Sequence, residues 1–272
     1  MTADASFLVQ QAAWAGQHAL ALFFGLLALL WAFICACWWI RGQHGKARRP
    51  PGTAPGAGLP IGVGFTLLLL GIGVFTGLAS QVGAASPLTR ADQALTEALR
   101  THAPTPALHL FATLTHLADT ATLTGLCIGI AVALLALGQR GLALDWVVAV
   151  AGNGLLNQTL KQIFSRARPV VPDAWVTEHG FSFPSGHSSG ALVAYGMLTY
   201  LALRLLPARW HLPVLLLAVT LAFTVGASRV FLQVHFASDV IAGFASGGVW
   251  LVACLMGIGF IRGRTHPPAP KK

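Results

Sequence analysis

Three short clusters of polar residues interrupt a chain that is otherwise mostly apolar, and all of them lie between positions 161 and 239. In chain order the clusters are Lys161-x6-Arg168-Pro169, Phe183-Pro184-Ser185-Gly186-His187 and Ser228-Arg229-x5-His235-x3-Asp239. Together they hold basic side chains, two histidines and one carboxylate. Fixed cations and an oriented histidine are the groups needed to transfer a phosphoryl group without a metal ion. We therefore expect the clusters to meet in one phosphoryl-transfer pocket.

The third cluster contains the residues suited to a nucleophile. His235 and Asp239 are four residues apart, so on a helix they would share a face. An aspartate can accept a hydrogen bond from one imidazole nitrogen, which fixes the tautomer and leaves the other nitrogen free to attack. Arg229 lies upstream on the same connection and can hold phosphate oxygens bidentately. This spacing predicts a histidine nucleophile oriented by a carboxylate.

The first and second clusters contain the residues suited to binding an anion. Ser185 or Gly186 can form the N-cap of the long apolar segment that follows, and the first turn of such a helix leaves backbone N–H groups free. These groups and the helix dipole attract an anion, and glycine lets the backbone approach it closely. His187 would lie on the first turn, at the edge of this site, and Lys161 and Arg168 would add two cations.

The composition predicts a polytopic membrane protein. The chain is 55% apolar and only 9% charged, whereas a soluble domain carries about 25% charged residues. Runs of about 20 apolar residues are long enough to cross a bilayer as helices, and their lack of alternation argues against a barrel. We expect an all-α bundle with spans at about 19–40, 61–82, 120–137, 142–160, 187–206, 212–227 and 235–260.

The basic residues indicate how the chain is oriented. The net charge of +9 comes mostly from Lys and Arg in short loops, which is typical of the cytoplasmic side of a membrane and gives no reason to expect nucleic-acid binding. We expect the N-terminus outside, the C-terminus in the cytoplasm and the three clusters on the outer face. Residues 89–99 predict a short amphipathic helix at the outer interface, ended by Pro104 and Pro106.

Other polar residues have simpler interpretations. His102, His109 and His116 recur every seven residues, but two prolines interrupt any continuous helix there, so interfacial polar residues are favoured over a metal site. The chain has only eight acidic residues and no acidic cluster suited to magnesium. We therefore expect no metal and no cofactor. The four cysteines lie in apolar runs and are expected to be small core residues. These are Cys35, Cys37, Cys127 and Cys254.

The three clusters resemble the signature motifs of the type 2 phosphatidic acid phosphatase (PAP2) superfamily, and in particular its bacterial membrane lipid phosphatase branch. The resemblance implies a six-span catalytic domain over residues 61–260. Residues 1–60 would then be an additional transmembrane helix with a basic Pro/Gly-rich linker, and residues 261–272 a basic cytoplasmic tail.

The resemblance also implies roles for individual residues. His235 would attack phosphorus and become phosphohistidine, and Asp239 would orient it. His187 would protonate the leaving oxygen and then activate water. The phosphate would be bound by Lys161, Arg168, Ser185, Gly186 and Arg229.

The function implied is that of a lipid phosphate or diphosphate phosphatase of the bacterial inner membrane, acting on the periplasmic face. Phosphatidylglycerophosphate, phosphatidate and undecaprenyl diphosphate are candidate substrates, and the motifs leave the oligomeric state open. A lipid-linked phosphotransferase with the same histidine chemistry is the main alternative, because only the second acceptor differs. A non-catalytic scaffold or transporter is another. The vanadium haloperoxidases share the motif set but are soluble, which seven spans argue against.

Overall fold

The computed structural model describes residues 3–48, 60–83, 86–171 and 175–265, and within these ranges the regular secondary structure is entirely helical. An all-α bundle is therefore confirmed. The helices are α1 (Ala3–Gln17), α2 (Ala19–Arg48), α3 (Ile61–Ala79), α4 (Pro87–His102), α5 (Thr105–Leu114), α6 (Thr120–Ala136), α7 (Arg140–Phe164), α8 (Gly186–Leu205), α9 (His211–Phe231) and α10 (Ala237–Thr265).

Each span expected from the sequence coincides with a helix, namely α2, α3 and α6 to α10. By length and apolar composition, four helices of the described residues qualify alone as membrane spans: α2, α3, α10 and α9 with the short turn before it. The segments Thr105–Ala118 and Thr120–Ala136, bent by 43° at their junction, give a fifth if taken as one span. Both α7 and α8 carry more polar side chains, and α8 is largely covered by its neighbours. The chain is thus a multi-pass membrane protein.

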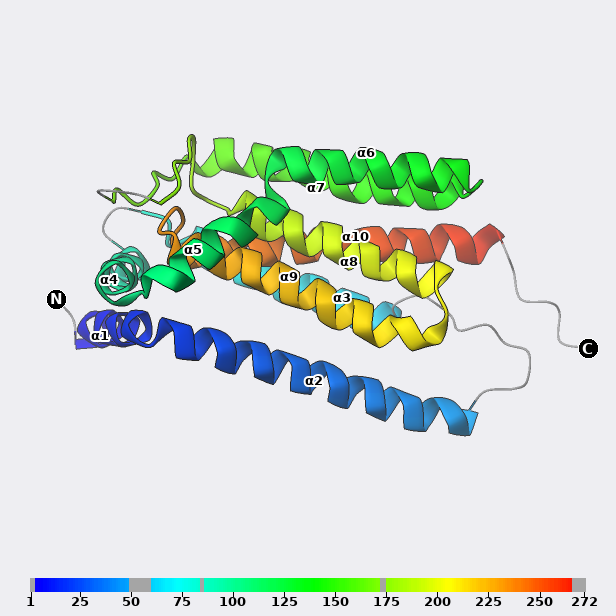
Figure 1. Cartoon of the computed structure of the whole chain (residues 1–272), viewed down its shortest axis with the longest axis horizontal. Helices are drawn as coiled ribbons and strands as arrows, with labels where there is room; N and C mark the ends of the chain where they lie inside the picture. Colours follow the sequence, from blue (N-terminus) through cyan, green and yellow to red (C-terminus); the bar gives the residue numbers. More distant parts are fainter. Residues whose placement is uncertain (1–2, 49–59, 84–85, 172–174, 266–272) are drawn as a thin grey trace, which may run out of the picture.

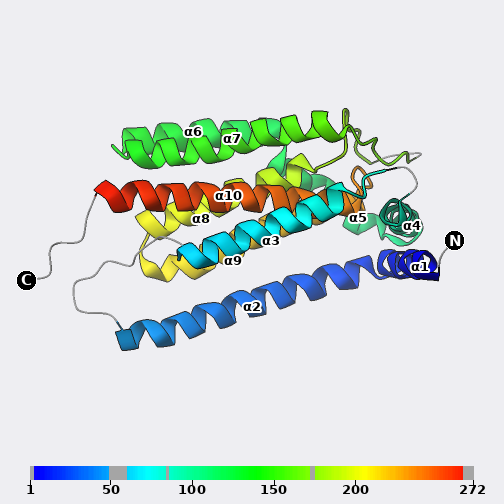
Figure 2. The same ribbon diagram turned by 180° about the vertical axis from the view of Figure 1, so that it is seen from behind.

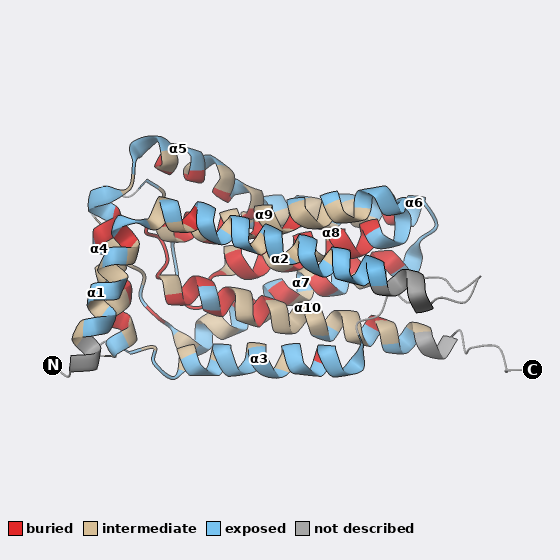
Figure 3. Ribbon diagram, turned by 90° about the horizontal axis from the view of Figure 1, so that it is seen from below, coloured by how far each residue is buried: buried red, intermediate tan, exposed pale blue. Residues whose placement is uncertain are grey.

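The long helices run roughly side by side, and the short helices gather at one end (Figure 1). At that end lie α1, α4, α5 and the connection between α7 and α8, whereas the described C-terminal residues lie at the other end. The view from behind shows α3 lying across α10 (Figure 2). Colouring by burial places most of the buried residues in and around α8 and the site end, and leaves α2 and α3 largely exposed (Figure 3).

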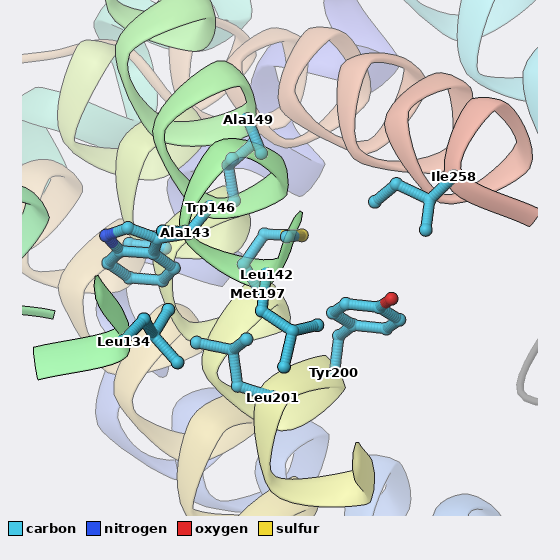
Figure 4. Close-up of a cluster of buried hydrophobic side chains, with 11 residues drawn as sticks. Leu134, Leu142, Ala143, Trp146, Ala149, Met197, Tyr200, Leu201 and Ile258 are labelled. Carbon is cyan, nitrogen blue, oxygen red and sulfur yellow. The ribbon is translucent and has the colours of Figure 1, made fainter. Parts of the chain in front are cut away.

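The largest apolar core lies between α6, α7, α8 and α10 (Figure 4). It contains Trp146, which is fully buried and donates its indole N–H to the carbonyl of Cys127 at 3.0 Å. Met197 and Leu201 of α8 approach this ring from the other side of the cluster. An indole is tolerated in an apolar interior when its N–H has an acceptor. This core fixes α7 against α8, and so fixes the two helix ends that carry the first and second clusters.

A second core, rich in aromatic rings, joins α2 to the bundle. Phe23 lies 5.3 Å from Phe111 and 5.5 Å from Phe223 between ring centroids, and Phe111 stacks on Phe231 at 4.3 Å. Aromatic pairs at these distances contribute about 0.5–1.5 kcal/mol beyond their buried area. The additional N-terminal helix is therefore attached mainly through its first half.

The N-terminal and interfacial segments differ in part from expectation. No helix was predicted before residue 19, yet α1 forms there and packs along α4. The amphipathic helix expected over residues 89–99 is present as the longer α4, capped by the Ser86 hydroxyl, which accepts from the Thr89 N–H at 3.0 Å. The prolines expected to end it lie beyond His102, and α5 starts between them. The longer span of α4 reflects its N-cap and Pro87, which favour an earlier start.

The three regularly spaced histidines of this segment have three different sets of neighbours. His102 approaches the Ala98 carbonyl at 2.9 Å, His109 lies edge-on to Trp175, and His116 pairs with Asp119 at 2.7 Å. These contacts are those of polar residues at the end of the bundle.

Contact between α8 and α10 depends on small residues, which gives a stability prediction. A Cβ added at Gly243 would lie 2.5 Å from the Ser185 carbonyl oxygen, whereas one at Gly248 would meet only Leu192 at 3.7 Å. Because the Ser185 backbone cannot yield as a flexible side chain does, Gly243→Ala should lower the midpoint of thermal unfolding in detergent by roughly 2–8 °C. Gly248→Ala, the matched control, should leave it unchanged or raise it, since alanine favours helix. Equal midpoints for the two variants would contradict this close approach.

Candidate active site

The ends of α7, α8, α9 and α10 bring the three clusters together at one end of the bundle. Lys161 lies on the last turn of α7, His187 on the first turn of α8 and Arg229 on the last turn of α9. A cavity of about 890 Å³ opens beside Lys161 and His187. Of the eight residues expected from the sequence, five line it: Lys161, Arg168, Gly186, His187 and His235. The other three, Ser185, Arg229 and Asp239, are buried around it.

His235 and Asp239 are adjacent, but not as two residues of one helix. Helix α10 begins at Ala237, so His235 belongs to the preceding turn, where Gln233 has a positive φ of 58°. His235 Nδ1 lies 3.5 Å from Asp239 Oδ2. The Ser182 hydroxyl donates to the same carboxylate and lies 3.3 Å from Nδ1. The carboxylate and the hydroxyl thus face one ring nitrogen together.

The other nitrogen of His235 faces the cations. Its Nε2 lies 3.1 Å from Arg168 Nη1, which is a donor only, so Nε2 is the acceptor and Nδ1 carries the proton. Burial lowers the pKa of His235 to about 3, although the hydrogen bond and the charge of Asp239 oppose this. The ring is therefore neutral at physiological pH, with a lone pair on the nitrogen that faces the cavity.

Backbone carbonyls hold two of the cations, Arg168 and Lys161. Arg168 donates to the carbonyls of Val234 at 2.8 Å and Gly180 at 3.1 Å. Lys161 Nζ donates to the Phe181 carbonyl at 2.5 Å. Such fixed donors need little reorganisation when charge develops on a bound group.

The second cluster joins the third through its backbone. The Ser185 N–H donates to the Asp239 carbonyl at 2.9 Å, and the Ser185 hydroxyl caps α8 by accepting from Ser188. A Cβ at Gly186 would lie 2.9 Å from Asn157 Oδ1, so a side chain there would meet α7. The expected N-cap is therefore formed by Ser185. Its hydroxyl points to the cap, and a contact from this hydroxyl to phosphate remains a prediction.

His187 has a carboxylate partner that the sequence analysis missed. Its Nε2 lies 2.9 Å from Asp119 Oδ1, and the other oxygen of Asp119 pairs with His116 at 2.7 Å. Asp119 immediately precedes α6. The chain has only eight acidic residues. An acidic residue directly before an apolar segment is therefore unusual in it, and this position could have identified Asp119 from the sequence.

Four further residues contact the site, and no role was assigned to them from the sequence. Arg166 lies between Asp239 and Asp92, the Ser182 hydroxyl binds Asp239, and Glu178 pairs with Arg229. Burial raises the pKa of Asp92, against the opposing hydrogen bonds of Ser238 and Arg166. All of them except Asp92 lie in one polar loop, whose composition was the only sequence signal.

Glu178 occupies the cation side of the pocket. It accepts from the buried Arg229 guanidinium and lies 3.9 Å from Arg168. Burial acts to raise the pKa of Glu178, but the charges of Arg229 and Arg168 outweigh it and the net pKa is lowered. An ionised carboxylate therefore lies against the guanidinium that the sequence predicts to bind phosphate.

The cavity continues from this polar end along the bundle. It follows α6 past Cys127 and Ile128 and α7 past Val150 and Ala151. At 1.5 Å per residue, the stretch of α7 from Val150 to Lys161 is about 16 Å long. The cavity thus combines a cationic end with a mostly apolar groove between helices.

These features define a class of protein: a multi-pass helical membrane protein with a histidine- and cation-lined anion pocket at one end. Residues 142–260, somewhat less than half of the chain, match the family model described as the PAP2 superfamily, which is the family that the three motifs resemble.

A protein sequence and a crystal structure, both from Bacillus subtilis, are similar to this chain. Phosphatidylglycerophosphatase B of strain 168 is 42% identical over 95 residues, which cover 34% of this chain and 46% of that protein. The aligned part thus spans just under half of the relative. The crystal structure of "the first transmembrane PAP2 type phosphatidylglycerolphosphate phosphatase" has a TM-score of 0.65 and 27% identity, covering 76% of this chain and 98% of its own.

The Glu178–Arg229 pair predicts how the pocket responds to an anion. Glu178→Gln removes the negative charge but keeps the size of the side chain, so inorganic phosphate should bind roughly five-fold more tightly. The measurement is the shift of the thermal unfolding midpoint with phosphate concentration, because a ligand of the folded state stabilises it.

The matched control is Glu97→Gln, which removes an exposed glutamate of α4 paired with Arg100 at 2.6 Å. It should bind phosphate as the wild type does. Weaker phosphate binding by Glu178→Gln would mean that the carboxylate organises the cations and does not compete with the anion.

Proposed function

We propose that this protein is a lipid phosphate or diphosphate phosphatase that acts through a phosphohistidine intermediate and needs no metal ion. The observation that carries the proposal is the environment of His235, with Asp239 and Ser182 at one ring nitrogen and the cation-lined cavity at the other. Such an arrangement fixes the tautomer and leaves a neutral imidazole nitrogen as the nucleophile.

In the first step, His235 Nε2 attacks phosphorus and the bond from phosphorus to the lipid oxygen breaks. His187, in its protonated form, gives its proton to the leaving oxygen. The contact of His187 Nε2 with Asp119 Oδ1 at 2.9 Å supports this role, because the carboxylate orients the imidazole ring. The products of the step are the lipid alcohol and phosphohistidine.

In the second step, His187 accepts a proton from water, and the water oxygen attacks the phosphorus of phosphohistidine. The P–N bond breaks, inorganic phosphate leaves, and His235 and His187 return to their starting states. Using one residue as acid and then as base is the ordinary course of double-displacement hydrolysis.

The cations Lys161, Arg168 and Arg229 would bind the equatorial phosphate oxygens, where charge is spread in the transition state. Backbone N–H groups of the first turn of α8, at Gly186, would add neutral donors. In this scheme Glu178 leaves the Arg229 guanidinium when the phosphate arrives, so the resting site holds its own carboxylate in place of substrate.

The apolar part of the cavity supports a lipid substrate, since it runs from the cationic end between α6 and α7. We propose that the phosphate of a lipid lies at Lys161 and Arg168 while its chain follows this groove. The names of the two Bacillus relatives favour phosphatidylglycerophosphate first. Phosphatidate and undecaprenyl diphosphate are the further candidates.

The site is proposed to face the periplasm. The described end opposite the site carries Arg140, Arg204 and Arg209, as the positive-inside bias requires of a cytoplasmic side. The N-terminus would be outside and the C-terminus in the cytoplasm. Residues 61–260 would form the catalytic domain of a bacterial inner-membrane enzyme, with residues 1–60 and 261–272 as its additional helix, linker and tail.

The test is phosphate release by the purified protein, with EDTA present, from a panel of lipid monophosphates and diphosphates. We expect release from one or a few lipids, and its loss by at least roughly 10³-fold in His235→Ala, which lacks the nucleophile. His211→Ala, at the opposite end of the bundle, should keep wild-type activity.

Release abolished by EDTA would contradict the metal-independent mechanism. If label moved from the lipid to an added acceptor lipid with no free phosphate formed, the protein would be a phosphotransferase.

A second prediction concerns the role of His187 as the acid. His187→Ala should lower turnover of a lipid phosphate by about 10²–10⁴-fold but that of p-nitrophenyl phosphate much less, because a good leaving group needs little protonation. The measurement is kcat/KM for both substrates in both proteins. Equal losses on the two substrates would exclude the acid role.

A further inference from the structure

A buried charged cluster outside the three motifs lies directly behind His235 and Asp239. Arg166 lies between two carboxylates: its Nη1 donates to Asp239 Oδ1 at 2.6 Å, and its Nη2 donates to Asp92 Oδ2 at 3.0 Å. The guanidinium also lies over the Phe236 ring, 4.4 Å from its centroid. A planar cation between two acids links α4 to the turn that carries His235.

Asp92 also holds this turn directly. Its Oδ1 accepts from the Ser238 N–H at 3.1 Å, and its Oδ2 accepts from the Ser238 hydroxyl. Arg166 donates to the same hydroxyl at 2.7 Å. Ser238 lies between Ala237, where α10 starts, and Asp239. The first turn of α10 is therefore fixed from α4 by one carboxylate that makes both backbone and side-chain contacts.

The charges in this cluster balance one another around the Asp239 carboxylate. That carboxylate uses Oδ1 for Arg166 and Oδ2 for Ser182, the Phe236 N–H at 2.9 Å and the His235 ring. Without a second carboxylate beside it, the Arg166 guanidinium would weaken the interaction between the Asp239 carboxylate and the His235 imidazole. Asp92 offsets the guanidinium, because it is a second carboxylate buried against the same cation.

We propose that Asp92 and Arg166 are positioning residues of the reaction, which hold Asp239, and through it His235, in the geometry for attack on phosphorus. The inference rests on the hydrolysis proposed above. It assigns a function to a part of the chain that the family model does not reach, since Asp92 lies well before residue 142.

The N-terminal helix α1 supports the same assembly. A Cβ at Gly16 would lie 2.6 Å from Ala98 Cβ and 2.9 Å from the Leu95 carbonyl oxygen, so α1 and α4 approach at backbone distance. Leu95 is one turn from Asp92 along α4. A series of contacts therefore connects α1 through α4 and Arg166 to the Asp239 carboxylate.

The test separates positioning from phosphate binding. Asp92→Asn should lower kcat by about 10–100-fold, the loss typical of a reacting group displaced by about 1 Å. The inhibition constant of inorganic phosphate should stay within about two-fold, because phosphate is held by Lys161, Arg168 and Arg229, none of which contacts Asp92. Glu97→Gln on the same helix is the control and should change neither quantity.

The double variant Asp92→Asn/Arg166→Gln keeps the proposal falsifiable if a single variant is unstable. Residues that act as one unit are non-additive, so the double variant should lose no more kcat than the worse single variant. The positioning role would be overturned if the kcat losses of the two single variants multiplied in the double variant, or if Asp92→Asn left kcat unchanged. It would also be overturned if kcat, phosphate inhibition and thermal stability were all lost in parallel. A wild-type protein without phosphatase turnover would instead overturn the proposed function.

Discussion

The structure of the site end depends on one buried carboxylate, Asp239. Its oxygens accept from Arg166, Ser182 and the Phe236 N–H, and its backbone carbonyl accepts from the Ser185 N–H. A buried carboxylate is strongly destabilising unless its lone pairs are filled by such donors. Because the donors come from separate parts of the chain, satisfying this one group requires the connection after α7, the start of α8 and the turn before α10 to meet at one place.

The apolar bundle makes that meeting possible. In a membrane the backbone must be satisfied within each segment, so the crossings are helices and the irregular polar connections gather at an end. The core around Trp146 fixes α7 against α8, and close approach at Gly243 brings α10 against the start of α8. Packing of side chains deep in the bundle thereby determines the positions of polar groups at its end.

Acidic side chains of the protein itself balance the buried guanidinium groups of the site. A buried guanidinium with no counter-charge is costly, and Arg229 is paired with Glu178 and with the Thr115 hydroxyl at 2.7 Å. The Glu178 carboxylate balances the charge of this cation, and under the proposed function it would compete with phosphate for it. The same principle explains Arg166, whose two acidic partners make it a structural cation that is not available to a substrate.

The sequence by itself determined the membrane class, the long helices and the members of the three motifs, because apolar runs of bilayer length and polar groups at fixed spacing are local properties. It did not determine Asp92, Asp119 or Glu178 as members of the site. Asp92 and Asp239 lie far apart along the chain, and only the packing of α4 against the turn before α10 brings them to one guanidinium. It also placed His235 on a helix. In the structure the N–H groups of Val234 and His235 donate to the Arg229 carbonyl, and the Phe236 N–H donates to the Asp239 carboxylate, so His235 lies in a turn. The spacing of residues along the sequence shows which chemical groups are available, and long-range contacts determine which of those groups face each other.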